Sequence, residues 1–285
     1  LESLGIANYF VFPAINWGQK SANLKAIAKI MNLGLDSFAF IDDSPFERGD
    51  VRQNLPVVRV FCEKDIPKLS MLPEFNPPVS KESKSRRSFY LKEMERKKIE
   101  INFSGDRLGF LESCQLKMNI TRLSKTNTDA YQRCYELIQR TNQLTLTAKR
   151  YMPDEYKRLI EDRSIKCYII QVSDRFGDYG IVGFVAVHVA GTSAHITEFV
   201  MSCRIAMKQC EAATVDALAK HLKKQGIDGL FANLIKTDRN HALVSAFSET
   251  GFIGKHEPTN GSVFYTMDLK KYRGQKVPVC VNEIN

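Results

Sequence analysis

The stretch "FIDDSPFERGDVRQNLP", residues 40–56, places two adjacent aspartates, Asp42 and Asp43, directly after an apolar run. Mg²⁺ is usually held by one or two such carboxylates together with water and phosphate oxygens, so the pair predicts a metal site. Lys20, upstream of the pair, carries an ammonium group that suits a phosphate. The same Asp-Asp-Ser-Pro order is also a sound turn and helix cap, and both interpretations stay open.

The segments around this stretch alternate between strand and helix. Residues 8–16, 37–43 and 57–62 are apolar and of strand length, and residues 19–34 carry apolar side chains at helical spacing. Strands joined by a helix with short connections predict a parallel βαβ arrangement, whose ligand site lies at the carboxyl ends of the strands. We therefore expect a Rossmann-like α/β unit with the aspartate pair at such an end.

A boundary follows, because four prolines lie between residues 67 and 78 and a charged helix then runs to about residue 101. We expect a first domain over 1–76, a linker helix over 77–107 and a second domain over 108–285.

The second domain reads as α+β with a mainly antiparallel sheet, since most of its predicted strands follow one another without a helix between them. The predicted strands are 116–124, 166–174, 180–189, 194–203, 229–236 and 263–269. The predicted helices are 128–142, 210–226 and 240–251.

Composition limits the function classes. The 285 residues are 44% apolar and 26% charged, as in ordinary globular proteins, and they contain no apolar run long enough to span a membrane. The net charge of +9 is spread along the chain rather than gathered in a stripe, which argues against nucleic acid. Seven cysteines without metal-site or disulfide spacing favour reduced thiols and a cytoplasmic location.

Several motifs carry a family resemblance. The order Lys20, helix, strand, aspartate pair resembles the last two motifs of haloacid dehalogenase (HAD) phosphatases, and residues 16–56 resemble the FkbH-type branch (subfamily IIIC) in detail. The stretches "RTNQLTLTAKRY" (140–151), "VSDRFGDYGIVGF" (172–184) and "MSCRI" (201–205) also resemble that family. The resemblance therefore covers essentially the whole chain.

This resemblance implies a bifunctional enzyme of methoxymalonyl-type polyketide extender biosynthesis. Such an enzyme dephosphorylates 1,3-bisphosphoglycerate, a small phosphorylated three-carbon substrate, and loads the glyceryl unit on the phosphopantetheine arm of an acyl carrier protein. The family's DxDx(T/V) nucleophile motif is not found in this sequence. We therefore expect an N-terminally truncated phosphatase half, with Mg²⁺ bound only together with an upstream half, and a sheet edge left open.

The second domain resembles the GNAT acyltransferase fold, in which a strand, a bulged turn and a helix N-terminus bind pantetheine and pyrophosphate. Cys203, at the end of such a strand and near the positive charges of Arg204 and Lys208, is the candidate acyl-carrying thiol, and a small buried residue is the alternative. Arg204 is also a candidate substrate-binding residue. A GNAT loop contains Gly-x-Gly, whereas "RIAMKQCEA" contains no glycine. That departure counts against ordinary acetyl-CoA binding.

The stretch "DRFGDYG" is the second candidate site. Arg175 is a candidate substrate clamp, and Asp174 and Asp178 are candidates to orient it or to act as a catalytic base, with a plain hairpin turn as the alternative.

Further candidate substrate-binding residues lie in two polar segments. The helix caps that polar residues often form are the alternative for all of them. They are Asn142, Gln143, Arg150 and Asn240.

Two other functions remain open besides glyceryl transfer. One is a GNAT-type N-acyltransferase that acts on an amino sugar or amino acid with a CoA-bound or carrier-bound donor. The other is a non-catalytic module that docks a carrier protein. The sequence does not decide the acceptor, the pathway or the oligomeric state.

Overall fold

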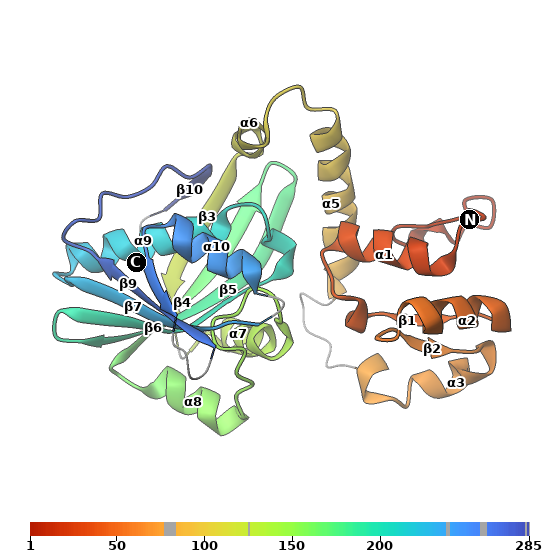
Figure 1. Cartoon of the computed structure of the whole chain (residues 1–285), viewed down its shortest axis with the longest axis horizontal. Helices are drawn as coiled ribbons and strands as arrows, with labels where there is room; N and C mark the ends of the chain where they lie inside the picture. Colours follow the sequence, from red (N-terminus) through yellow and green to blue (C-terminus); the bar gives the residue numbers. More distant parts are fainter. Residues whose placement is uncertain (77–83, 125, 238–239, 257–260, 283, 285) are drawn as a thin grey trace. The chain divides into compact units, whose positions relative to one another are not determined.

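The computed structural model describes residues 1–76, 84–124, 126–237, 240–256, 261–282 and 284. The chain divides into two compact units, Leu1–Glu95 and Arg96–Asn285 (Figure 1). The division falls inside helix α5 (Arg86–Ile101), within the segment expected to link two domains. Among the described residues no helix is long and apolar enough to cross a membrane.

The first unit contains a two-stranded parallel sheet. Strand β1 (Ala39–Ile41) pairs with β2 (Arg59–Phe61), and helix α2 (Pro45–Asn54) connects the two strands. Helix α1 (Lys20–Met31) precedes β1. A small core forms around three buried residues of α2 and the turn after it, Val51, Leu55 and Val58. The parallel pairing of these two expected strands therefore agrees with the sequence pattern, but the helix between them is α2, whereas the pattern placed its helix over residues 19–34, before both strands. The remaining short elements are η1 (Ala7–Tyr9), η2 (Leu35–Ser37), η3 (Glu63–Asp65), α3 (Ile66–Leu69) and η4 (Pro73–Phe75).

The strand expected over residues 8–16 is wrong. A short 3-10 helix, η1, covers its start, and the described residues between η1 and α1 contain no strand. Pro13 lacks the amide that a paired strand needs. Tyr9, Ile15 and Trp17 are largely exposed, and Phe12 packs edge-on against Tyr90 of α5, with ring centres 6.2 Å apart.

The second unit contains an eight-stranded sheet in the order β10-β3-β4-β5-β6-β7-β9-β8. Neighbouring strands are antiparallel except for the pairs β10–β3 and β6–β7, so the expected mainly antiparallel sheet is confirmed. The sequence pattern missed the short strands β8 and β10. The strands are β3 (Leu116–Arg122), β4 (Ile165–Asp174), β5 (Gly177–Ala190), β6 (Ser193–Met201), β7 (Gly229–Ile235), β8 (Ile253–His256), β9 (Ser262–Asp268) and β10 (Val279–Val281).

Helices cover both faces of this sheet (Figure 1). One face packs against α7 and α8, and the other packs against α9 and α10. Along β4, Cys167 and Ile169 belong to the α7 face, whereas Tyr168 and Ile170 belong to the α9 face. Because both faces are buried, the strands read as continuous apolar runs. The helices are α6 (Arg107–Ser113), α7 (Thr128–Arg140), α8 (Pro153–Glu161), η5 (Cys203–Ile205), α9 (Cys210–Lys224) and α10 (His241–Glu249).

Strand β6 contains a one-residue bulge. Ala186 of β5 pairs with Glu198, whereas the next residue, Val187, pairs with Ile196, so Thr197 is the extra residue. An extra residue shifts the alternation of side chains by one.

The bulge decides which face each later side chain of β6 joins. Ile196 and Phe199, three residues apart, both belong to the α9 face. Val200 belongs to the α7 face, and Glu198, two residues before it, shares that side.

Strands β6 and β7 separate soon after they begin. They pair only over Ser193–Ile196 and Gly229–Ala232, although both strands continue beyond these residues. A segment from the connection between α7 and α8 bridges to the separated part of β6, with Thr145 opposite Val200. Along the edge of β6 that does not face β5, the second half of the strand therefore has the α7–α8 connection, rather than β7, as its neighbour.

Candidate functional site

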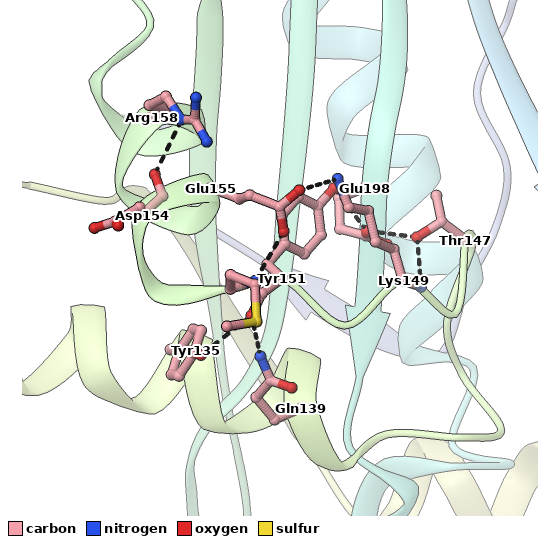
Figure 2. Close-up of polar contacts among 10 residues, drawn as sticks. Tyr135, Gln139, Thr147, Lys149, Tyr151, Asp154, Glu155, Arg158 and Glu198 are labelled. Atoms are coloured by element: carbon pink, nitrogen blue, oxygen red, sulfur yellow. Dashed lines mark hydrogen bonds and ion pairs between the residues drawn. The ribbon is translucent and has the colours of Figure 1, made fainter.

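Glu198 is a fully buried carboxyl group in the middle of the sheet, with an exposed fraction of 0%. Oε2 accepts hydrogen bonds from the Thr147 hydroxyl at 2.7 Å and from the Tyr151 hydroxyl at 3.2 Å. Oε1 accepts one from the backbone N–H of Phe199 at 3.1 Å. Figure 2 shows the two hydroxyl-bearing side chains converging on this carboxyl from the α7–α8 connection.

Burial raises the pKa of Glu198 to about 7, and its hydrogen bonds from Thr147, Phe199 and Tyr151 act in the opposite direction without cancelling the effect. A carboxyl with a pKa near neutral pH exists in both protonation states under physiological conditions. It is therefore suited to accept and release a proton during a reaction.

Arg150 anchors the α7–α8 connection to the end of α7. The guanidinium of Arg150 donates to the carbonyls of Ile138 and Thr141, at 2.7 and 2.8 Å, and to Asn142 Oδ1 at 2.6 Å. These bonds satisfy the carbonyls at the C-terminal end of α7. Arg150 and Asn142 thus form the helix cap that was the alternative to substrate binding, and Gln143 lies beside them, half-buried.

Tyr151 is fixed from three sides. Its carbonyl accepts hydrogen bonds from Tyr135 and Gln139 of α7. The Lys149 ammonium lies 4.4 Å from the centre of the Tyr151 ring and 3.2 Å from Glu155 Oε1 (Figure 2). Burial and the nearby Glu198 raise the pKa of the Tyr151 hydroxyl, which therefore remains a hydrogen-bond donor at neutral pH.

Glu155 ties this arrangement to helix α8. Its Oε2 accepts from the backbone N–H of Met152 at 2.8 Å, which completes a capping box at the start of the helix. That hydrogen bond, together with Lys149, lowers the pKa of Glu155. Lys149 is thereby held between an ionised carboxylate and the Tyr151 ring.

Sequence reasoning missed the carboxyl and its partners, Glu198, Thr147 and Tyr151. The available signal was a single acid inside the otherwise apolar run "HITEFVM", because an acid in a strand buried on both faces needs hydrogen-bonding partners. The partners lie about 50 positions earlier in the chain, and only the folded topology brings them to the strand.

Asn240 is also fully buried, with an exposed fraction of 0%. Its Nδ2 donates to the carbonyls of Ile235, at 2.8 Å, and Thr145, at 3.3 Å, and its Oδ1 accepts from the Thr237 N–H at 2.9 Å. The side chain therefore joins the end of β7, the α7–α8 connection and the start of α10.

Cys203 opens the short helix η5 and is half-buried. Arg204, beside it, donates from Nε to the Ser202 hydroxyl at 3.2 Å. Lys208 is 2% exposed, donates to the Arg204 carbonyl at 2.9 Å and lies over the ring of Tyr179 at 5.5 Å. The Lys208 ammonium is thus engaged with a backbone carbonyl and an aromatic ring.

The start of α9 carries a buried acid. Glu211, in its first turn, is 5% exposed, and its Oε1 has no hydrogen-bond partner among the described residues. Burial raises its pKa to about 7, while its own backbone N–H and the charge of Lys208 lower it. A carboxyl therefore sits in the helix turn where the GNAT resemblance places the anionic pyrophosphate.

The loop between β4 and β5 is a tight hairpin turn. Asp174 accepts from the backbone N–H groups of Phe176 and Gly177 and from the Tyr179 hydroxyl, at 2.8, 3.1 and 2.6 Å. Asp178 accepts from the Gly180 N–H at 2.7 Å. These are the contacts of a self-contained turn, the alternative to a catalytic role.

Arg175 of the same turn stacks on its neighbour. Its guanidinium carbon lies 4.9 Å from the centre of the Phe176 ring, and its backbone N–H donates to the Cys114 carbonyl at 3.0 Å. The described contacts bring neither Arg175 nor the two aspartates to Glu198.

In the first unit, the aspartate pair forms a helix start. Asp42 Oδ1 accepts from the Ser44 N–H at 2.9 Å, Ser44 caps α2, and Arg48 donates to the carbonyls of Asp42 and Asp43. Lys20 opens α1 and makes no hydrogen bond or ion pair with either aspartate. No cluster of three or more His, Cys, Asp or Glu suited to a metal occurs among the described residues. The residues present therefore give no support to a magnesium-dependent step.

Comparison with known proteins adds the following. No protein-family model and no curated protein matches this chain. A domain from Methanocaldococcus jannaschii is 15% identical, with a TM-score of 0.42 over 54% of this chain and 99% of that one. The ribosomal-protein-S18-alanine N-acetyltransferase of Escherichia coli is 14% identical, with a TM-score of 0.41 over 53% of this chain and 94% of that one.

A third solved structure, spermidine N-acetyltransferase from Vibrio cholerae in complex with CoA and spermine, is 12% identical, with a TM-score of 0.40 over 54% of this chain and 97% of that one. Scores this low carry no argument about activity.

Proposed function

We propose that the second unit transfers an acyl group from a pantetheine thioester to an amine, with Glu198 as the general base. The observation that carries this proposal is a fully buried carboxyl with its pKa raised to about 7, beside the place where two parallel strands separate. This is the N-acyltransferase alternative of the sequence analysis, now with a named base.

The reaction balances without a metal or redox partner. The nitrogen of the acceptor attacks the thioester carbonyl, a C–N bond forms, and the C–S bond breaks. Glu198 takes the proton that an ammonium acceptor loses before it attacks, and the second proton, which the nitrogen loses as the amide forms, passes to the released pantetheine thiolate. Glu198 then returns its proton to water. Because an amine is mostly protonated at neutral pH, a base with a pKa near 7 is well matched to this proton transfer.

The residues around Glu198 keep its carboxyl oriented. Thr147 and Tyr151 donate to the same oxygen, Oε2, from one side, and the strand backbone donates to Oε1. Each carboxylate oxygen still has capacity to accept a further hydrogen bond from an amine N–H that reaches it.

For the donor, we keep the acyl carrier protein as the proposed partner. The turn before α9 holds Met207 and Gln209 at positive φ, 64° and 58°, where glycine would be expected. Glu211 adds a carboxyl to the first helical turn, which disfavours a pyrophosphate there. A carrier-bound pantetheine has a single phosphodiester and therefore meets less repulsion than CoA.

The test is thiol release from acetyl-pantetheine in the presence of a panel of amino sugars and amino acids. Glu198→Gln keeps the shape of the side chain and removes the base, and we expect a loss of about a hundredfold or more near neutral pH. Glu161→Gln, an exposed acid at the end of α8, is the matched control. Equal rates for the wild type and Glu198→Gln from pH 5 to pH 9 would refute the proposal.

A further inference from the structure

Three backbone groups face the gap where β6 and β7 have separated. They are the carbonyl of Phe199, the N–H of Met201 and the N–H of Ile235. Pantetheine is an extended ligand with N–H and C=O groups. To bind as an added strand, it would need strand-edge groups like these three to be free of other hydrogen bonds.

All three groups are already satisfied by the chain itself. The Leu146 N–H donates to the Phe199 carbonyl at 2.9 Å, and the Met201 N–H donates to the Leu144 carbonyl at 2.8 Å. On the other side, the Ile235 N–H donates to the Leu146 carbonyl at 3.0 Å. The α7–α8 connection thus forms hydrogen bonds with both separated strands.

The side chains complete this closure. Leu144 and Leu146 are 1% and 0% exposed and belong to the same buried cluster as Phe199, Met201 and Leu243. The space between the strand ends on the α9 face is therefore filled by leucine side chains rather than left open.

The next residue reaches the base. Thr147 follows Leu146 directly, and its hydroxyl is the nearer of the two side-chain donors to Glu198, at 2.7 Å against 3.2 Å for Tyr151. Leu144–Thr147, hereafter the latch segment, therefore touches both the strand gap and the base within four consecutive residues.

We infer that the latch segment is a built-in occupant of the acyl-donor slot, that the donor binds by displacing it, and that this displacement withdraws Thr147 from Glu198. Thr147 is then a positioning residue that couples donor entry to release of the base. The consequence is an ordered reaction, with the donor first and the amine second. This inference rests on the function proposed above.

The first experiment locks the latch segment. Thr145 and Val200 lie opposite each other as a non-hydrogen-bonded antiparallel pair, the geometry in which Cα atoms are about 4.5 Å apart and a disulfide fits. The variant Thr145→Cys/Val200→Cys is compared in oxidised and reduced forms. The single variants Thr145→Cys and Val200→Cys, treated in the same way, control for the native cysteines.

The ligand is S-ethyl-pantetheine, a thioether that neither transfers an acyl group nor reduces a disulfide. We expect binding by calorimetry to weaken about tenfold or more on oxidation of the double variant and to return on reduction, with the single variants unchanged. Equal binding by the locked and reduced forms would overturn the inference and leave the proposed function standing. Absence of binding by the wild type and every variant would overturn the proposed function itself, and the inference with it.

The second experiment follows the coupling in the unmodified fold. The groups that face Glu198 are Thr147, Tyr151 and the charge of Arg150. Because the Thr147 hydroxyl favours the ionised carboxylate, Thr147→Val raises the pKa of Glu198, as read by NMR of ¹³C-labelled glutamate.

In the wild type, S-ethyl-pantetheine shifts the Glu198 titration in the same direction as Thr147→Val does. In Thr147→Val, the ligand produces a smaller shift, because the contact is already absent. A ligand that binds while the Glu198 titration stays unchanged in the wild type overturns the coupling. An unchanged Glu198 titration is the result expected if Thr147 has only a structural role.

Discussion

The hydroxyl of Thr147 lies 2.7 Å from Oε2 of Glu198, although the two residues belong to different parts of the fold. One lies in the connection between α7 and α8, and the other lies in the strand that this connection covers. The contact makes the environment of a buried acid depend on where a loop rests.

The stability of the second unit should fall as pH rises through the titration of Glu198. The pKa of Glu198 is raised from 4.5 to about 7, so the folded state binds more protons than the unfolded state between these values. The stabilisation is fully present below pH 4.5 and is lost as pH passes 7. Glu198→Gln removes this loss, which amounts to at most about 3 kcal/mol.

Urea unfolding at pH 5 and pH 8, followed by circular dichroism, measures this difference. Tryptophan fluorescence would not serve, because the single Trp17 lies in the first unit. A wild type that loses no more stability between the two pH values than Glu198→Gln would contradict the raised pKa.

Tyr151→Phe should move the acidic limb of the pH–rate profile to higher pH, because the lost hydroxyl favours the ionised Glu198. Tyr272→Phe is the matched control, since Tyr272 donates to the Asp216 carboxyl at 2.7 Å elsewhere in the unit. The measurement is the pH–rate profile of both variants and the wild type from pH 5 to pH 9. An unshifted limb in Tyr151→Phe would show that this contact does not tune the base.

Asn240→Ala should loosen the latch segment, because it removes donors to the Thr145 and Ile235 carbonyls. We expect a loss of about 1–3 kcal/mol in unfolding free energy together with tighter binding of S-ethyl-pantetheine. Asn127→Ala, which removes the cap of α7, should also cost stability but leave ligand affinity unchanged. A fall in the affinity for S-ethyl-pantetheine in both variants would mean that Asn240 supports the acyl-donor slot itself rather than the latch segment that closes it.

At pH 8, above the raised pKa of about 7, Glu211→Gln should strengthen binding of CoA by about five- to tenfold, because it removes a negative charge from the first turn of α9. S-ethyl-pantetheine has no phosphate, so its affinity should not change. Calorimetry with both ligands on both proteins gives the comparison. An equal change for the two ligands would place the effect of Glu211 on folding rather than on the anionic part of CoA.

In the first unit, Asp42→Ala should cost about 1 kcal/mol, because its carboxylate accepts the Ser44 N–H at the start of α2. Asp43→Ala is the neighbouring control, since the hydrogen bond made there uses its backbone carbonyl. Added magnesium should not change the thermal midpoint of the wild type. A rise in that midpoint with magnesium, abolished by Asp42→Ala, would restore the metal interpretation.

Hydrophobic patterning predicted most strands of the second unit, because those strands are buried on both faces and read as long apolar runs. It failed at the edges of the sheet. Strand β8 is exposed along its length and β10 has three residues, so neither carries a strong apolar signal. Helix α8 was missed, although Pro153 at its first position and the Glu155 cap mark its start.

The candidate site was less predictable than the fold. Motif reasoning selected Cys203, Asp174 and Arg150 by residue type, and the structure shows that Asp174 and Arg150 satisfy nearby backbone groups. A polar residue in a loop is as suited to capping as to catalysis, and spacing does not separate the two roles. Glu198 becomes recognisable only when its burial and its distant partners are both known.

The bulge at Thr197 makes β6 sensitive to insertions and deletions in a way that substitutions do not reproduce. Deleting this one residue would restore simple alternation and leave the Glu198 carboxyl and Phe199 on their present sides, whereas pairing Thr197 within the ladder would turn Glu198 toward α9 and carry Phe199 to the opposite side. To find the acid equivalent to Glu198 in another protein, the β-bulges of the two strands should therefore be aligned first, and the residues then counted from the bulge. A gap placed elsewhere in the strand assigns the acid to the wrong side of the sheet.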